Sequence, residues 1–256
     1  KIGQVFGGGN AAPVKGDVTI DIGTATVSKI PSTGEDAEKI GIRIINGTDY
    51  LKTTTDADTT ITAGIYGGGN AADVDGNVTM NIGTVSQNQG INIGGDIYGG
   101  GLGDKAVEGD NTHHDYPAHV NGKVFVNIGS GEKGSDGCAA NIMGNATIDG
   151  AVYGCNNVNG TPLDSVFVNI YKTAHGDSPQ TNHYPTEYPT NYDEWSIEAL
   201  AANAAYQTYA ISAVYGGGNK AAYLPPLNGN NTPKCTTVHV WACRENTIRE
   251  VYGGGN

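Results

Sequence analysis

The hexapeptide Ile65-Tyr66-Gly67-Gly68-Gly69-Asn70 decides the fold, because five close relatives of it occur elsewhere in the same 256-residue chain. They begin at residues 5, 97, 152, 214 and 251, and each opens with Val or Ile followed by an aromatic residue. By subtraction, the units between copies are about 60, 32, 55, 62 and 37 residues long. A fixed motif separated by segments of variable length is typical of stacked repeats with protruding loops.

A second motif of six residues follows each complete copy. Apolar residues predicted to point inward alternate in it with residues, mostly polar or aromatic, predicted to point outward. It reads Val18-Thr19-Ile20-Asp21-Ile22-Gly23 in the first unit and begins at Val78, Val124, Val166 and Val238 in the later ones. Strict alternation predicts a strand with one buried face. A third, weaker apolar stretch precedes each later hexapeptide, at 60–63, 91–94, 146–149, 209–212 and 246–249. Three short strands in every unit predict a three-sided coil.

These motifs predict an all-β fold, namely a right-handed parallel β-helix or β-solenoid of about five to six coils, forming one domain over residues 1–256. An irregular array of β-sandwiches and a β-propeller are the alternatives, and a propeller needs more regular blades than these units provide. Because the chain begins and ends inside its repeat, we expect a fragment of a longer chain, with targeting signals outside it.

Stacked coils place equivalent residues about 4.8 Å apart, so identical side chains form ladders. We expect an aromatic ladder made of Phe6, Tyr66, Tyr98, Tyr153, Tyr215 and Tyr252. We also expect an amide ladder, interrupted by Leu102, made of Asn10, Asn70, Asn157 and Asn219. The glycine triplet suits a sharp corner, where positive φ and close backbone approach are needed. It does not predict a phosphate-binding loop, because neither a helix pattern nor a Lys-Ser/Thr pair follows it.

The charge of the chain argues against two classes of partner. The formal net charge is −12, with only 14 Lys and Arg residues. Binding to nucleic acid or to an anionic membrane requires clustered cations, and no basic stripe is present. No apolar run approaches the roughly 20 residues of a membrane span, so we expect no direct membrane insertion of this segment.

The sequence predicts neither a cofactor nor a disulfide-rich scaffold. None of the spacings among Cys138, Cys155, Cys235 and Cys243 is a metal-binding pair, so thiols in turns are expected, with disulfides between neighbouring coils as the alternative. Acidic residues near the corners favour at most an incidental calcium ion, the candidates being Asp17, Asp21, Asp73 and Asp75.

Three insertions leave the repeat, at 29–60, 102–123 and 171–210, and function on a solenoid usually lies in such loops. The first is polar and predicts a solvated loop. The second contains His113, His114, Asp115 and His119, which suit zinc by residue type, although an ordinary polar loop is the expected structure.

The third insertion contains a helix pattern near 193–206, with acidic residues at its start and an Ala-rich body. The candidate ligand contacts are the aromatic residues Tyr184, Tyr188, Tyr192 and Trp195, which offer stacking surfaces for a sugar ring. Docking of the helix onto the coil is the expected role of Trp195, and ligand contact is the alternative. No catalytic residues are predicted, because the carboxylate pair of a glycosidase and the basic cluster of a lyase are not recognisable.

The alternation of Val-Tyr-Gly-Gly-Gly-Asn with Val-Thr-x-Asn-Ile-Gly covers essentially the whole chain and resembles the repeat regions of large adhesin-like surface proteins of anaerobic gut bacteria. The resemblance implies export to the cell surface and a stalk or display scaffold without catalytic residues. The expected function is a non-catalytic adhesive or structural module that meets a host or bacterial surface protein or glycan. A carbohydrate-binding or polysaccharide-processing role for 171–210, and a fibre-forming subunit that associates end to end, are the alternatives.

Overall fold

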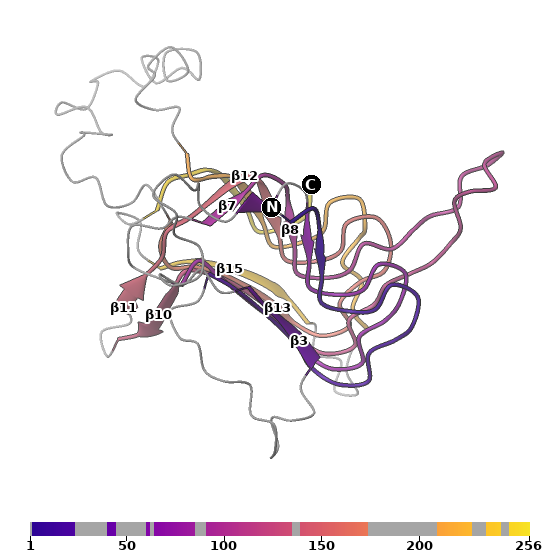
Figure 1. Ribbon diagram of the computed structural model, residues 1–256, viewed down its shortest axis with the longest axis horizontal. Coiled ribbons are helices and arrows are strands. Elements are labelled where there is room, and N and C mark those ends of the chain that lie inside the picture. Colours follow the sequence, from indigo (N-terminus) through magenta and orange to yellow (C-terminus); the bar gives the residue numbers. More distant parts are fainter. Residues whose placement is uncertain are drawn as a thin grey trace, which may run out of the picture.

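The computed structural model describes residues 2–23, 40–44, 60–61, 64–84, 91–134, 139–173, 209–226, 234–241 and 246–256. Every element in this part of the chain is a β-strand, and the strands gather in two large sheets and one small antiparallel pair (Figure 1). All pairings within the two large sheets are parallel. The predicted all-β class with parallel strands is therefore confirmed, whereas the predicted helix near 193–206 lies outside the described residues.

The first large sheet has eight strands and carries the hexapeptides in chain order. Its main path is β1 (Val5–Phe6), β5 (Ile65–Tyr66), β8 (Ile97–Tyr98), β12 (Ala146–Tyr153), β14 (Ile211–Tyr215) and β16 (Ile248–Tyr252). The third apolar stretches join the same sheet, where β4 (Thr60–Ile61) pairs with β7 (Ile91–Ile93) and β7 pairs with β12. The prediction that the third apolar stretch forms a third side of the coil is wrong. In β12 this stretch and the hexapeptide belong to one continuous strand, with a register irregularity between Ile148 and Ala151.

The second large sheet has six strands and carries the alternating motifs. Its order is β3 (Ile40–Ile44), β2 (Val18–Ile22), β6 (Val78–Ile82), β9 (Val124–Ile128), β13 (Val166–Ile170) and β15 (Thr236–Val240). The prediction that these motifs lie side by side in one parallel sheet is confirmed. The last motif, however, starts at Thr236, which pairs with Val166, and not at Val238. A shift of two residues preserves the alternation, so the pattern alone did not reveal it.

Two further segments differ from a plain repeat. Residues 40–44 lie in the insertion predicted to be a solvated loop, yet they form β3, which pairs with β2 over five positions at the outer edge of the sheet. The small pair consists of β10 (Ser130–Lys133) and β11 (Ala139–Met143), and it projects from the end of β9 (Figure 1). The alternation of Ile40, Ile42 and Ile44 was the signal that the polar composition around it obscured.

We call one passage of the chain through the first and then the second large sheet a rung. The core lies between the sheets and is built mainly from β-branched side chains, among them Ile65, Ile97, Val126 and Val168. These residues and the unbranched Met80 are fully buried. Single bridges from Val74 to Val14 and to Val120 connect successive rungs where the chain passes from one sheet to the other. Burial of each such side chain contributes roughly 1.5–3 kcal/mol, so the core repeats its stabilisation rung by rung.

The first glycine of the hexapeptide is required by close packing between rungs. A Cβ atom built on Gly99 would lie 2.3 Å from the carbonyl oxygen of Gly154 and 2.5 Å from Cγ1 of Val124. The equivalent Gly67 has the same environment, 2.3 Å from the Gly99 oxygen. These positions therefore need glycine because the next rung occupies the space of a side chain.

The aromatic residues of the hexapeptides stack on the outer face of the first sheet. The rings of Phe6, Tyr66, Tyr98, Tyr153, Tyr215 and Tyr252 follow one another with centroid separations of 4.6–4.9 Å and interplanar angles of 5–8°. Although they point away from the main core, Tyr66, Tyr98 and Tyr153 are buried, because they cluster with Ala151, Ala213 and their neighbours in the stack. The outer face of this sheet is thus a second, smaller hydrophobic layer.

Candidate functional site

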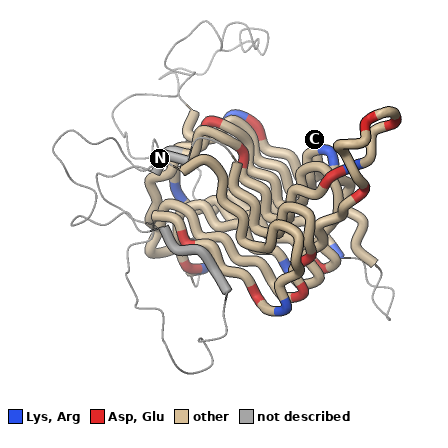
Figure 2. The backbone as a smooth tube through the Cα atoms, turned by 45° about the vertical axis from the view of Figure 1, so that its right-hand side comes forward, with Lys and Arg blue, Asp and Glu red and all other residues tan. Residues whose placement is uncertain are grey.

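A hairpin spanning residues 104–116 protrudes from the stack of rungs (Figure 1). Asp104 and Tyr116 pair at its base, each donating its N–H to the other's carbonyl oxygen at 2.8 and 3.0 Å, and Val107 bridges to Asp110 at its tip. Val107 is 53% exposed. Figure 2 shows acidic and basic residues gathered on this protrusion, while the strands of the rungs carry few charges. The hairpin is therefore a charged protrusion from a weakly charged stack of strands.

The predicted second insertion, 102–123, was too long at its C-terminal end. Ala118 and Val120 are fully buried, and Val120 bridges to Val74 in the preceding rung and to Pro162 in the following one. The chain has thus rejoined the rung directly after the hairpin. The polar composition around these two small apolar residues concealed their role in the core.

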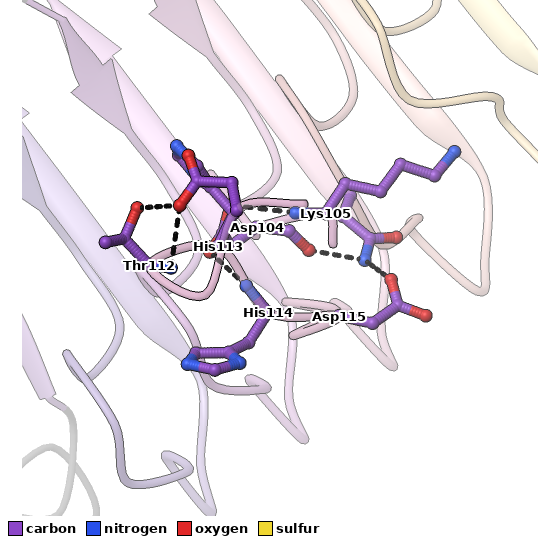
Figure 3. Close-up of polar contacts among 8 residues, drawn as sticks. Asp104, Lys105, Thr112, His113, His114 and Asp115 are labelled. Atoms are coloured by element: carbon purple, nitrogen blue, oxygen red, sulfur yellow. Dashed lines mark hydrogen bonds and ion pairs between the residues drawn. The ribbon is translucent and has the colours of Figure 1, made fainter. Parts of the chain in front are cut away.

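Asp104 organises the base of the hairpin (Figure 3). Its Oδ2 accepts a hydrogen bond from the backbone N–H of His114 at 2.9 Å, and its Oδ1 lies 2.9 Å from Nδ1 of His113. The backbone N–H of His114 and the His113 ring hold the pKa of Asp104 below its usual value. Conversely, the hydrogen bond and negative charge of Asp104 raise the pKa of His113. The pair binds the two sides of the hairpin through an ion pair when His113 is protonated.

Asn159, which lies in the following rung, anchors the hairpin to the scaffold. Its Nδ2 group donates hydrogen bonds to the carbonyl oxygen of Asp104 at 2.7 Å and to Oδ1 of Asp115 at 2.8 Å. At the tip, Asp110 accepts hydrogen bonds from the hydroxyl and the N–H of Thr112 at 2.6 and 2.8 Å. Both ends of the hairpin are therefore held by side chains that sequence reasoning did not single out.

The four residues proposed as a possible zinc site do not converge. Of their side chains, only the His113 ring contacts Asp104, whereas the carboxylate of Asp115 bonds to Asn159. His119 lies in the rung, where its Nδ1 accepts a hydrogen bond from the N–H of Thr161 at 3.1 Å. Among the described residues, no group of three or more His, Cys, Asp or Glu side chains is placed to hold a metal ion. The ordinary polar loop, stabilised by hydrogen bonds, is the structure of this insertion.

The aspartates near the corners serve contacts between rungs. Asp17 accepts a hydrogen bond from the N–H of Asn77 at 2.7 Å, Asp73 accepts one from the N–H of His119 at 2.7 Å, and Asp75 pairs with Lys15 at 2.7 Å. The hydrogen bond from Lys15 lowers the pKa of Asp75. These carboxylates thus join successive rungs.

The predicted amide ladder runs beside the Gly corners. Nδ2 of Asn70 donates to Oδ1 of Asn10 at 2.7 Å, and Nδ2 of Asn219 donates to Oδ1 of Asn157 at 3.1 Å. Asn256 continues it by donating to Asn219 at 3.1 Å. Leu102 takes the intervening place, and Asn157 instead donates to the hydroxyl of Tyr66 at 3.3 Å.

A second amide ladder, which sequence reasoning missed, crosses the outer face of the six-stranded sheet. Asn81 donates to Asp21 at 2.8 Å, Asn127 to Asn81 at 2.9 Å and Asn169 to Asn127 at 2.9 Å. The ends fix its direction. Asp21 can only accept when ionised, and Trp241, which reaches Asn169 Oδ1 at 3.4 Å, can only donate. The signal in the sequence was the recurrence of Asp or Asn at the fourth position of the motif.

The remaining predicted residues are distributed as follows. Tyr184, Tyr188, Tyr192 and Trp195 lie outside the described residues, as do Cys138 and Cys243. Cys155 is buried and Cys235 exposed, and both are free thiols. Burial raises the pKa of Cys155, which keeps this thiol protonated and unreactive at neutral pH.

Comparisons with protein-family models, curated proteins and solved structures found no match to this chain. Within the described residues, no helix is long and apolar enough to cross a membrane.

The Asp104–His113 pair predicts a measurable pH dependence. The raised pKa of His113 means that the pair stabilises the hairpin below about pH 6.5 and that this contribution is lost as the pH rises through the raised pKa. The lowered pKa of Asp104 sets the acid limit, below about pH 4. In a titration of the imidazole resonances by NMR, the midpoint of His113 should lie above 6.5 in the unmodified chain.

The matched variants isolate the cause of that shift. Asp104→Asn should return the midpoint of His113 toward 6.5, whereas Asp115→Asn should leave it raised, because Asp115 bonds to Asn159. An unchanged His113 midpoint in Asp104→Asn would contradict the assignment.

Proposed function

We propose that this chain is a right-handed parallel β-helix, or β-solenoid, that serves as a non-catalytic adhesive scaffold in the extracellular space or at a cell surface. Strands of successive rungs pair in parallel, and they follow chain order in both sheets except for β3, which lies outside β2 at the edge of the six-stranded sheet. Parallel crossover connections are right-handed in about 98% of cases, which supports the handedness. The partner of such a scaffold is a host or bacterial surface protein or glycan, and no catalytic group is assigned.

The observation that carries this proposal is the constancy of register across units of very different length. Tyr66 pairs with Tyr98 across a unit of about 32 residues, and Tyr153 pairs with Tyr215 across one of about 62 residues, at nearly the same ring separation. The hairpin at 104–116, in the unit of about 55 residues between Tyr98 and Tyr153, lies outside the rungs. In such a fold the stack of rungs provides a rigid support, and the protruding segments are free to contact a partner. An adhesive scaffold requires this division.

Shortening the hairpin tests this division of roles. Asp104 and Tyr116 already pair across its base, so residues 105–115 can be replaced by Asn-Gly, a sequence that favours a two-residue hairpin turn. We expect the thermal midpoint of the shortened chain to stay within about 2 °C of the original, because exposed residues away from the core contribute little to stability. Beads coated with the chain should bind epithelial or bacterial cells, and the shortened chain should bind them less.

Uncoated beads and beads coated with the heat-unfolded chain are the controls for non-specific adhesion. The scaffold proposal would be contradicted by an intact chain that adheres to no cell surface tested yet releases reducing ends from a polysaccharide. A large loss of thermal stability on shortening would show that the hairpin is part of the core.

A further inference from the structure

The outer face of the six-stranded sheet carries an uncharged strip of rings and amides between β6 and β15. One column across the rungs contains Thr79, Phe125, Phe167 and Thr237. The neighbouring column, two residues along each strand, contains Asn81, Asn127 and Asn169, flanked by Asp21 on β2 and His239 on β15. Inward neighbours on the same strands are fully buried, whereas these outward residues keep part of their surface exposed. We call these two columns, together with Tyr171 and Trp241, the outer strip.

The aromatic rings of the outer strip occur on both sides of the amides. Phe125 and Phe167 stack with their centroids 5.2 Å apart, and Tyr171 stacks on Trp241 at 5.9 Å. Tyr171 also packs over the backbone of Gly131, where an added Cβ would lie 2.6 Å from its ring. The β10 segment therefore supports one side of the strip and holds a ring against it.

The amides in the middle retain unused hydrogen-bonding capacity. An asparagine side chain has two N–H donors and two acceptor lone pairs. Within the ladder, Asn127 uses one N–H toward Asn81 and one lone pair toward Asn169. Asn81 and Asn127 thus each keep one donor and one acceptor, a combination that matches a sugar hydroxyl, which also donates and accepts. Asn169 keeps one donor, because its Oδ1 lies 3.2 Å from Nδ1 of His239 and accepts a hydrogen bond from Trp241 at 3.4 Å.

Two properties of the strip select the class of ligand. Its phenyl, amide and hydroxyl side chains carry no charge, and burial raises the pKa of Tyr171, so that this ring is also neutral. A neutral strip on a chain of net charge −12 disfavours polyanions. The rung spacing of about 4.8 Å is also close to the length that one pyranose residue adds to an extended β-linked glycan, so successive sugars of a chain that runs across the strands would meet successive rungs.

We propose that the outer strip binds an extended, uncharged β-linked polysaccharide that runs across the strands, with its hydroxyls on Asn81, Asn127 and Asn169 and its apolar faces against the flanking rings. This inference deepens the proposed adhesive function and depends on it for its biological purpose. It differs from the expectation drawn from the sequence, which placed sugar contacts at Tyr184, Tyr188, Tyr192 and Trp195.

The test uses the whole chain in native gels that contain hydroxyethylcellulose, mixed-linkage β-glucan, galactomannan or dextran. Retardation by at least one of the three β-linked glycans, and not by the α-linked dextran, is expected, and it should persist in 0.5 M NaCl because no charges are involved. The double variant Phe125→Thr/Phe167→Thr should bind at least tenfold more weakly. Threonine occupies the same column at Thr79 and Thr237, so this replacement suits the strand.

A second variant keeps the proposal testable if the double variant fails to fold. Thr79→Phe adds a third ring to the column and should strengthen binding at least threefold. The chain with the shortened hairpin should keep its retardation, which separates this proposal from the cell-adhesion experiment. The proposal is overturned if none of the β-linked glycans retards the chain, if binding disappears in salt, or if neither variant changes it.

Discussion

Replacing Gly99 with alanine should lower the free energy of unfolding by about 3 kcal/mol, the upper part of the range for forcing extra atoms into a packed core. The added methyl group would meet the carbonyl oxygen of Gly154 at 2.3 Å and side-chain atoms of Val124 and Val126 at 2.5 and 2.8 Å. The nearest of these atoms belongs to the backbone of the next rung, so a rotamer change cannot remove the clash. Urea denaturation followed by circular dichroism measures the loss.

Gly253→Ala is the matched control for this substitution. Gly253 occupies the same place in the last hexapeptide, but a Cβ built there meets no atom within 4 Å. Its replacement should change stability by less than about 0.5 kcal/mol. Equal effects at the two positions would show that the glycine is needed for its backbone conformation and not for the close approach of the following rung.

Replacing Tyr98 with alanine should cost about 3–5 kcal/mol, the usual range for truncation of a buried aromatic residue. Tyr98 is only 2% exposed and stacks on Tyr66 and Tyr153, at 4.9 Å from each. Its hydroxyl donates to Asp96 at 2.8 Å, and burial followed by this contact raises its pKa, so it stays protonated. Loss of the ring would leave a cavity in the middle of the stack.

Two further substitutions separate the contribution of the Tyr98 hydroxyl from that of its buried ring. Tyr98→Phe removes only the hydroxyl and should cost about 1 kcal/mol, the typical net value of one hydrogen bond. Tyr252→Ala removes the ring at the end of the described stack, where the side chain is 44% exposed, and should cost clearly less than Tyr98→Ala. If Tyr252→Ala proved as damaging, burial between neighbouring rings would not be the source of the stabilisation.

The sequence allowed the register of the rungs to be predicted because a stacked fold repeats its constraints. At the corner only glycine avoids the next rung, and on each strand inward positions must be apolar, so the motifs mark equivalent residues directly. The pairing of Ile148 with Ile93 and Ile211 follows the predicted alignment. Such positions are predictable because the same contact is repeated between every pair of neighbouring copies, so the same residue type recurs at the same place in each copy.

Features that occur once were not predictable in this way. β3 has no counterpart among the described strands of the other units. The start of β15 is ambiguous by two residues because both registers bury alternate side chains. The merging of two motifs within β12 depends on the backbone path between Ile148 and Ala151, which no residue type specifies. The sequence therefore defined the repeating contacts but not the local departures from them.

The candidate site was predictable in location more than in structure. The cluster of histidines and aspartates at 113–119 drew attention to the second insertion, which indeed leaves the rungs. Yet its principal hydrogen bonds come from Asp104 and Asn159, which lie 10 and 45 positions from His114 along the chain. Residues that meet only through stacking cannot be paired from one sequence without the fold.

The fixed direction of the amide ladder on the six-stranded sheet has an electrostatic consequence. Since every amide from Asn81 to Asn169 points its oxygen toward the following rung, their dipoles add head to tail along the stacking axis. The arrangement is the side-chain counterpart of a helix macrodipole. The carboxylate of Asp21 lies at its positive end and the N–H of Trp241 at its negative end, and each further rung would polarise the ones before it.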